Sequence, residues 1–279
     1  TTSNKRSMMS EASTAMHIPS FGQSINISND TIALGNGTIF NFKIGKCLKR
    51  TKMDKFSHCA RGIYISPENR TKEDNKLLAQ LINPIFGEDK EMVQYMQKKY
   101  GSYCTINKSR EIDIFHGPGR NGKTLIIDAL GYLFGSFATV FNRNLIIGDS
   151  FKKSFENPHG HTAGSNVLNN KRLAVTDETQ DGETLTNTPL YKKLADGGCN
   201  ISGRELHKEQ GLGTNLTPHV VILTNHVNGL FNLSANDKTI VDRTNIIPFT
   251  SIFYDDNDEK IRRSEKYKYY QIDQKITNL

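Results

Sequence analysis

The stretch that decides the fold runs from residue 112 to residue 134 and reads IDIFHGPGRNGKTLIIDALGYLF. The apolar run Ile112–Phe115 predicts a strand, and the run Leu125–Phe134, which stops at Gly135, predicts a helix. Between them the chain fits the pattern G-x-x-x-x-G-K-[ST] in full, with Gly117, Pro118, Gly119, Arg120, Asn121, Gly122, Lys123 and Thr124. A glycine-rich turn from a strand into a helix, in this pattern, is typical of a phosphate-binding loop.

The residues of this loop are suited to binding phosphate. Its glycines let backbone N–H groups turn toward phosphate oxygens, and the N-terminus of the following helix adds partial positive charge. We expect Lys123 to contact the β- and γ-phosphates of ATP and Thr124 to bind Mg²⁺. The loop predicts ATP and Mg²⁺ as ligands but does not indicate what the energy drives.

A nucleotide site of this kind needs a carboxylate at the end of another strand. The segment Arg172–Thr176 is an apolar strand pattern followed directly by Asp177 and Glu178. We expect Asp177 to bind the hydrated Mg²⁺ and Glu178 to act as the base that activates water. A kinase, which transfers phosphate to a bound acceptor, would not need Glu178, so the pair favours a hydrolase.

Two further polar residues lie at the ends of later strand patterns. Asn225 ends the run Val220–Thr224, where its amide would contact the attacking water and the γ-phosphate. Arg243 precedes the last apolar run and is the candidate arginine finger that reaches a neighbouring subunit's ATP. That role requires an oligomer, and the alternative is an exposed surface arginine.

Changes in the residue pattern along the sequence divide the chain into three parts. Residues 1–55 are expected to form a polar arm, flexible over about the first 25 residues, followed by short strands, with a basic run interpreted as a solvated loop rather than a DNA site. Residues 56–108 are expected to form a small helical collar, because apolar residues recur there at helical spacing. Residues 109–279 are expected to form an α/β core with a central parallel sheet and a basic tail. The predicted strands are Ile112–Phe115, Val140–Ile147, Arg172–Thr176, Val220–Thr224 and Asn245–Phe249.

Composition narrows the class of protein. The net charge is +7 and the pI about 9.1, which suits a polyanionic partner such as nucleic acid. No apolar run is long enough to cross a bilayer and residues 1–24 show no secretory signal, so we expect an intracellular protein that is not secreted. The four cysteines have no C-x-x-C spacing, so free thiols are expected rather than a zinc site.

Taken together, these motifs resemble the superfamily 3 helicases. The set comprises the phosphate-binding loop, the Asp177–Glu178 strand, a Gly-Gly-x-x-Ile-Ser-x-Arg-Glu-Leu element that begins at Gly197, the strand ending in Thr-Asn, and an Arg-x-x-x-Ile-Pro-Phe element that begins at Arg243. The similarity is greatest to poxvirus-type and satellite-phage-type primase-helicases. It spans about Ile25 to Thr250 and is specific from Phe115 onward.

The resemblance implies an AAA+-like fold and a hexameric ring that moves along single-stranded DNA as an ATP-dependent helicase of a viral or mobile-element replication system. It implies that His207 and Lys208 lie on a hairpin that contacts the DNA backbone, and that Arg204 lies near the subunit interface or the nucleotide. A viral origin would place the protein in the host cytoplasm or nucleus. No primase motif occurs in the sequence, so a primase or polymerase partner would lie outside this chain.

One departure from the family pattern and two alternative functions remain. Asp242 precedes Arg243, whereas the family often has two adjacent basic residues there. An ATP-gated DNA-binding assembly or origin-recognition factor without unwinding activity would carry the same motifs. A P-loop nucleotide kinase is disfavoured by Glu178 and Asn225.

Overall fold

The computed structural model describes residues 2–15, 24–107, 109–149, 166–197, 200–201, 214–215, 217–231, 237–255 and 265–272. At its centre lies a five-stranded sheet with the order β12-β4-β11-β7-β5. Every pairing in this sheet is parallel, which confirms the predicted α/β class. The strands are β4 (Ile112–His116), β5 (Ala138–Phe141), β7 (Leu173–Thr176), β11 (His219–Thr224) and β12 (Thr244–Pro248).

Both faces of this sheet are covered, which explains why its central strands are continuous apolar runs rather than alternating ones. Ile112 and Ile114 of β4 belong to the buried cluster on one face, and Phe115 belongs to the cluster on the other. Asp113 shares the face of Phe115, because successive side chains of a strand point to opposite faces, and it is only 2% exposed.

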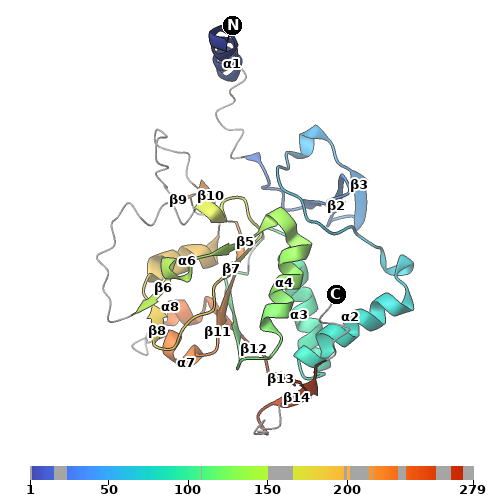
Figure 1. Ribbon diagram of the computed structural model, residues 1–279, viewed down its shortest axis with the longest axis vertical. Helices are drawn as coiled ribbons and strands as arrows, with labels where there is room; N and C mark the ends of the chain where they lie inside the picture. The colour runs from blue at the N-terminus through green and yellow to red at the C-terminus, as the bar shows by residue number, and fades with distance from the viewer. Residues whose placement is uncertain are drawn as a thin grey trace.

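Helices form the two outer layers, with the sheet between them (Figure 1). On one side lie α2 (Lys72–Ile85), α3 (Lys90–Ser102) and α4 (Lys123–Phe134). On the other lie α6 (Thr188–Asp196), α7 (Val227–Leu230) and α8 (Lys238–Val241). Buried apolar side chains of these helices join the cluster on their own face of the sheet.

Local residues define the ends of the predicted helices. Thr71 caps α2 by accepting from the Asp74 amide, and the Asp74 side chain caps the Thr71 amide in return. Asp89 caps α3 in the same way through two backbone amides, and α4 ends at Gly135 as predicted. The division into arm, collar and core stays a prediction, but α2 and α3 share one buried cluster with the sheet.

The structure departs from the sequence predictions near the N-terminus. The expected flexible arm contains a helix, α1 (Thr2–Ala15), which has no apolar face that a pattern could reveal. The basic run, expected to be a loop, contains strand β3 (Lys46–Lys49), an exposed edge strand. It pairs with β2 (Thr38–Asn41), which in turn pairs with β1 (Thr31–Ala33).

The single strand predicted over Val140–Ile147 was wrong. Strand β5 ends at Phe141, and the Asn142 side chain then accepts from the Asn144 amide and starts a short 3-10 turn, η5 (Arg143–Leu145). The chain next enters β6 (Ile147–Asp149), which pairs with β8 (Glu183–Leu185) outside the central sheet. The apolar run is therefore split by a polar turn.

The remaining elements are short. After β12 a parallel pair forms from β13 (Ser251–Tyr254) and β14 (Lys268–Gln271), beyond the last predicted strand. A second small pair is β9 (Asn200–Ile201) with β10 (Thr214–Asn215). The other 3-10 turns are η2 (Lys52–Asp54), η3 (Pro67–Asn69), η4 (Gly135–Phe137) and η6 (Asn166–Leu168). Within the described ranges, no helix combines the length and the apolar character that a membrane span needs.

Candidate functional site

Three chain segments meet at the carboxyl edge of the central sheet. Strand β4 leads into the glycine-rich loop, β7 ends directly before Asp177 and Glu178, and β11 ends directly before Asn225. Because β11 pairs with both β4 and β7 and all three are parallel, their carboxyl ends lie side by side.

The loop itself fits a phosphate group. A Cβ on Gly117 would lie 2.5 Å from the Phe249 carbonyl oxygen and would also collide with Asn121, so only glycine is accommodated. Gly122 has a φ of +83° and directly precedes α4, and as the N-cap residue it has no side chain to cap that helix. The Asn121 Nδ2 group is buried without a hydrogen-bond partner. The Lys123 amide donates to Asn121 Oδ1 at 3.3 Å, and the buried Asn121 Nδ2 donor at the start of this helix suits an anion.

Lys123 connects the three segments. Its Nζ donates to the Gly117 carbonyl at 2.5 Å and to Asn225 Oδ1 at 2.6 Å, and it lies 3.9 Å from a Glu178 carboxylate oxygen. Burial lowers the pKa of the lysine, and the nearby Glu178 charge partly opposes that effect. The structure thus brings three of the predicted catalytic side chains together on one ammonium group.

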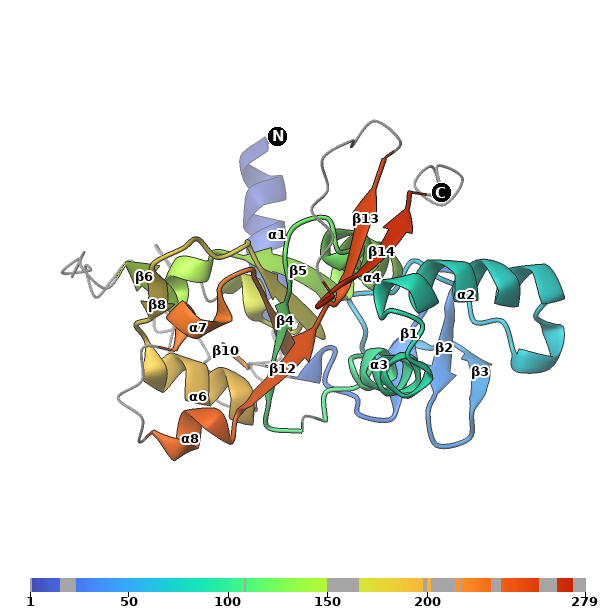
Figure 2. The same cartoon turned by 90° about the horizontal axis from the view of Figure 1, so that it is seen from below.

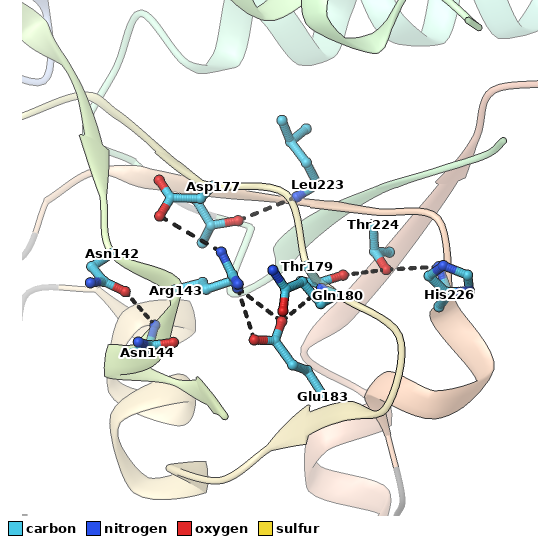
Figure 3. Close-up of polar contacts among 11 residues, drawn as sticks. Asn142, Arg143, Asn144, Asp177, Thr179, Gln180, Glu183, Leu223, Thr224 and His226 are labelled. Atoms are coloured by element: carbon cyan, nitrogen blue, oxygen red, sulfur yellow. Dashed lines mark hydrogen bonds and ion pairs between the residues drawn. The ribbon is translucent and has the colours of Figure 1, made fainter. Parts of the chain in front are cut away.

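The acidic loop after β7 is anchored by residues that the sequence motifs did not indicate. Arg143 donates from Nε to both Glu183 carboxylate oxygens at 2.8 and 3.0 Å, and its Nη1 lies 3.9 Å from Asp177 (Figure 3). Thr179 bonds the Thr224 hydroxyl at 2.7 Å, which ties this loop to β11. The only hint of Arg143 in the sequence was the polar interruption within the apolar run Val140–Ile147.

A divalent cation fits the same edge. The Asp177 side chain is 47% exposed and Thr124 is also exposed, so a carboxylate and a hydroxyl oxygen are accessible. Such oxygen ligands suit Mg²⁺, which keeps several waters and takes few protein groups. Within the described part of the chain no group of three or more His, Cys, Asp or Glu side chains could hold a metal ion. The assignment of Thr124 and Asp177 to Mg²⁺ stays a prediction.

Arg243 lies away from this site. Thr244 pairs with Ile112, the first residue of β4, so Arg243 sits at the amino edge of the sheet, about 16 Å of strand from the loop. Its guanidinium pairs with Asp196 at 3.1 and 3.2 Å and donates to the Thr239 carbonyl. Arg243 is thus placed away from the site of its own chain, and its role at a neighbour's site stays a prediction. Arg204, His207 and Lys208 lie outside the described residues.

Comparisons with known proteins show which proteins this chain is similar to. No protein-family model matches the chain. The chain is 26% identical over 191 residues to Putative helicase 184R of Invertebrate iridescent virus 6. That similarity covers 68% of this chain but only 19% of the viral protein, so this chain spans about a fifth of the length of its curated relative. The chain is therefore similar to part of a viral protein that is named as a helicase.

Some solved structures are also similar to this chain, at lower sequence identity. The C-terminal region of NrS-1 is 17% identical with a TM-score of 0.44, covering 78% of this chain and 43% of that one. JCV helicase is 15% identical with a TM-score of 0.41, covering 65% of this chain and 46% of that one.

Proposed function

We propose that this chain is the ATP-hydrolysing motor portion of a superfamily 3 DNA helicase that works as an oligomeric ring on single-stranded DNA. The observation that carries the proposal is the convergence of the glycine-rich loop, Glu178 and Asn225 on Lys123. The similarity to a viral protein named as a helicase supports strand separation as the use of the energy.

Each side chain of the site has a separate role in the proposed hydrolysis of ATP. Lys123 exchanges its contacts with Gly117 and Asn225 for the β- and γ-phosphates, which places its charge where negative charge builds up. Asn225, released from the lysine, is free to orient the attacking water. A bound Mg²⁺, held by Thr124 and Asp177, would neutralise further charge on the phosphates.

Glu178 is the group that favours hydrolysis over phosphate transfer. Its side chain is 53% exposed, so water reaches it, and it lies 3.9 Å from the lysine that would hold the γ-phosphate. A carboxylate in this place can accept a proton from water as the oxygen attacks phosphorus. A kinase would instead need a bound acceptor hydroxyl in that position.

The first experiment is ATP hydrolysis with and without single-stranded DNA, in the presence of Mg²⁺. We expect DNA-stimulated turnover that Glu178→Gln abolishes while ATP binding persists. Lys123→Ala should abolish ATP binding. Lys171→Ala is the matched control, because its pKa is also lowered by burial but it bonds Ser136 far from the loop.

The outcomes separate the candidate functions. Turnover that is indifferent to DNA would contradict the motor and favour an ATP-gated assembly or origin-recognition factor. DNA-stimulated turnover that Lys208→Ala uncouples, with basal hydrolysis intact, would support the proposed DNA contact of His207 and Lys208. Unchanged stimulation in that variant would contradict the contact.

A further inference from the structure

The order of the strands indicates where the base of a bound nucleotide must lie. Glu178 and Asn225 follow β7 and β11, so both hydrolytic side chains lie on one side of β4. A nucleoside triphosphate is a linear chain with the base at the end opposite the γ-phosphate. If the γ-phosphate lies at Lys123, as proposed above, the base extends toward the other side of β4, where β12 lies.

The β13–β14 pair occupies that side, directly along the loop. Phe249, just after β12, donates its amide to the His116 carbonyl at 2.7 Å. Phe253 of β13 donates its amide to the Arg120 carbonyl at 2.8 Å, within the loop itself. Figures 1 and 2 show both strands at the end of the molecule where α2 ends and α4 begins.

One aromatic ring of this pair, that of Phe253, lies beside the loop, and the ring of Tyr270 lies next to it. Phe253 pairs with Tyr270 in the strand register, and their ring centroids are 5.8 Å apart at an interplanar angle of 31°. A Cβ on Gly122 would lie 3.5 Å from Phe253 Cε2. Both rings are only partly buried.

The turn between α2 and α3 contacts β14. The Lys268 ammonium donates to the Gly87 carbonyl, which joins β14 to this turn. Burial raises the pKa of the Tyr270 hydroxyl, and the Glu88 carboxylate raises it further. Phe253 and the end of α2 both lie against Gly122, since a Cβ there would meet Ile85 at 2.9 Å and Phe253 at 3.5 Å.

We propose that the β13–β14 pair is the nucleobase-binding element of the site, with Phe253 and Tyr270 offering aromatic faces on which the base stacks. Every base has a π-face, and stacking on an aromatic side chain needs no hydrogen-bond pattern. Stacking strengthens with ring area, so purine nucleotides bind more tightly than pyrimidine ones at this element.

The test compares ATP with inorganic tripolyphosphate, which carries the phosphates without a base, on the full chain with Mg²⁺. Tyr270→Leu and Phe253→Leu keep apolar volume but remove the ring. We expect each to weaken ATP binding by about 5- to 100-fold and to leave tripolyphosphate binding unchanged. Tyr270→Phe, which keeps the ring, should bind ATP like the parent chain.

Tyr269→Leu is the matched control, since the neighbouring position of a strand points to the opposite face. It should change neither affinity. Equal loss of ATP and tripolyphosphate binding in Tyr270→Leu would overturn the inference, because the pair would then only support the shape of the loop. Unchanged ATP binding in both ring variants would also overturn it.

The parent chain separates this inference from the function on which it rests. Tighter binding of ATP than of tripolyphosphate is the expected result. Equal affinity for the two would overturn base recognition and leave the phosphate site standing. Binding of neither ligand would overturn the proposed function, and the base site with it.

Discussion

The two edges of the central sheet use charge in opposite ways. At the carboxyl edge the side chains of Asp177 and Glu178 are 47% and 53% exposed. Toward the amino edge Arg172 is fully buried and donates to the carbonyls of Ser28 and Thr31, and also to that of Cys104. One edge leaves charges accessible to a ligand, whereas the other uses them within the protein.

The buried charges near the amino edge hold separate segments together. Asp113 accepts from Tyr103 at 2.8 Å and from Asn245 at 2.6 Å, and pairs with Lys99 at 2.8 Å. These contacts join α3 to strands β4 and β12. A buried charge with several partners is costly to disrupt, whereas an exposed charge in a cleft between strands is free to bind a ligand. At the functional edge the two carboxylates are therefore accessible to a ligand, whereas Lys123 beside them is buried.

Arg243→Ala tests whether an amino-edge charge serves catalysis after all. If Arg243 acts as a finger at a neighbour's site, turnover should fall by about 10³- to 10⁵-fold with ATP affinity retained. If it only pairs with Asp196, the partly exposed ion pair contributes about 1 kcal/mol to stability. ATPase assays measure turnover, and urea denaturation measures the change in stability. Asp196→Ala, which breaks the same pair, should retain turnover; equal loss in both variants would contradict the finger.

Glu178→Gln tests the exposed carboxyl edge. Loss of a general base should reduce turnover by about 10²- to 10⁴-fold, while the amide leaves nucleotide binding intact. Steady-state hydrolysis and nucleotide titration measure the two quantities. Glu111→Gln is the control from the opposite edge, where this carboxylate pairs with Lys99 at 3.2 Å. Similar turnover losses in the two variants would mean that the edges do not differ as described.

Asp113→Ala tests the structural edge. Removing one partner of a buried charge network should lower the free energy of unfolding by about 3–5 kcal/mol, because Lys99 loses its closer carboxylate and keeps only Glu111. Urea denaturation measures this change. Asp177→Ala, at an exposed position, should change stability by about 1 kcal/mol or less. A larger loss for Asp177→Ala than for Asp113→Ala would reverse the comparison.

Alkaline pH should weaken the same network. Burial raises the pKa of Tyr100 and Tyr103, with Asp113 adding to it. Burial alone would lower the pKa of Lys99, but Asp113 and Glu111 outweigh burial and raise it. The folded chain therefore holds these protons more tightly, and stability should fall as pH rises above about 10, where the unfolded chain releases them.

Tyr100→Phe measures one part of that effect. The buried Tyr100 hydroxyl has no hydrogen-bond partner, so its removal should be neutral or stabilising by about 1 kcal/mol at pH 7. Above pH 10 the variant should lose less stability than the parent chain, by about 1.4 kcal/mol per pH unit at most. Parallel pH profiles for the two proteins would show that Tyr100 does not titrate on unfolding.

Much of the fold was predictable because local rules govern it. The strand–loop–helix unit from Ile112 to Phe134 follows from apolar runs, glycines and a terminating Gly135. Four of the five predicted strands appear within one or two residues of their expected bounds. Among the elements that were missed, β3 is exposed and α1 has no apolar face, so burial imposed no apolar pattern on their sequences.

The sequence by itself determined which residues are available for the site, since Lys123, Glu178 and Asn225 each follow a recognisable local pattern. Only the tertiary structure decided that Lys123 contacts Asn225, 102 residues further along the chain. It also decided that Arg143 supports the acidic loop, that Arg243 pairs with Asp196, and that β13–β14 lies against the loop. These contacts depend on the spatial order of the strands in the sheet. That order is set by the packing of segments that are distant in the sequence, and no single segment encodes it.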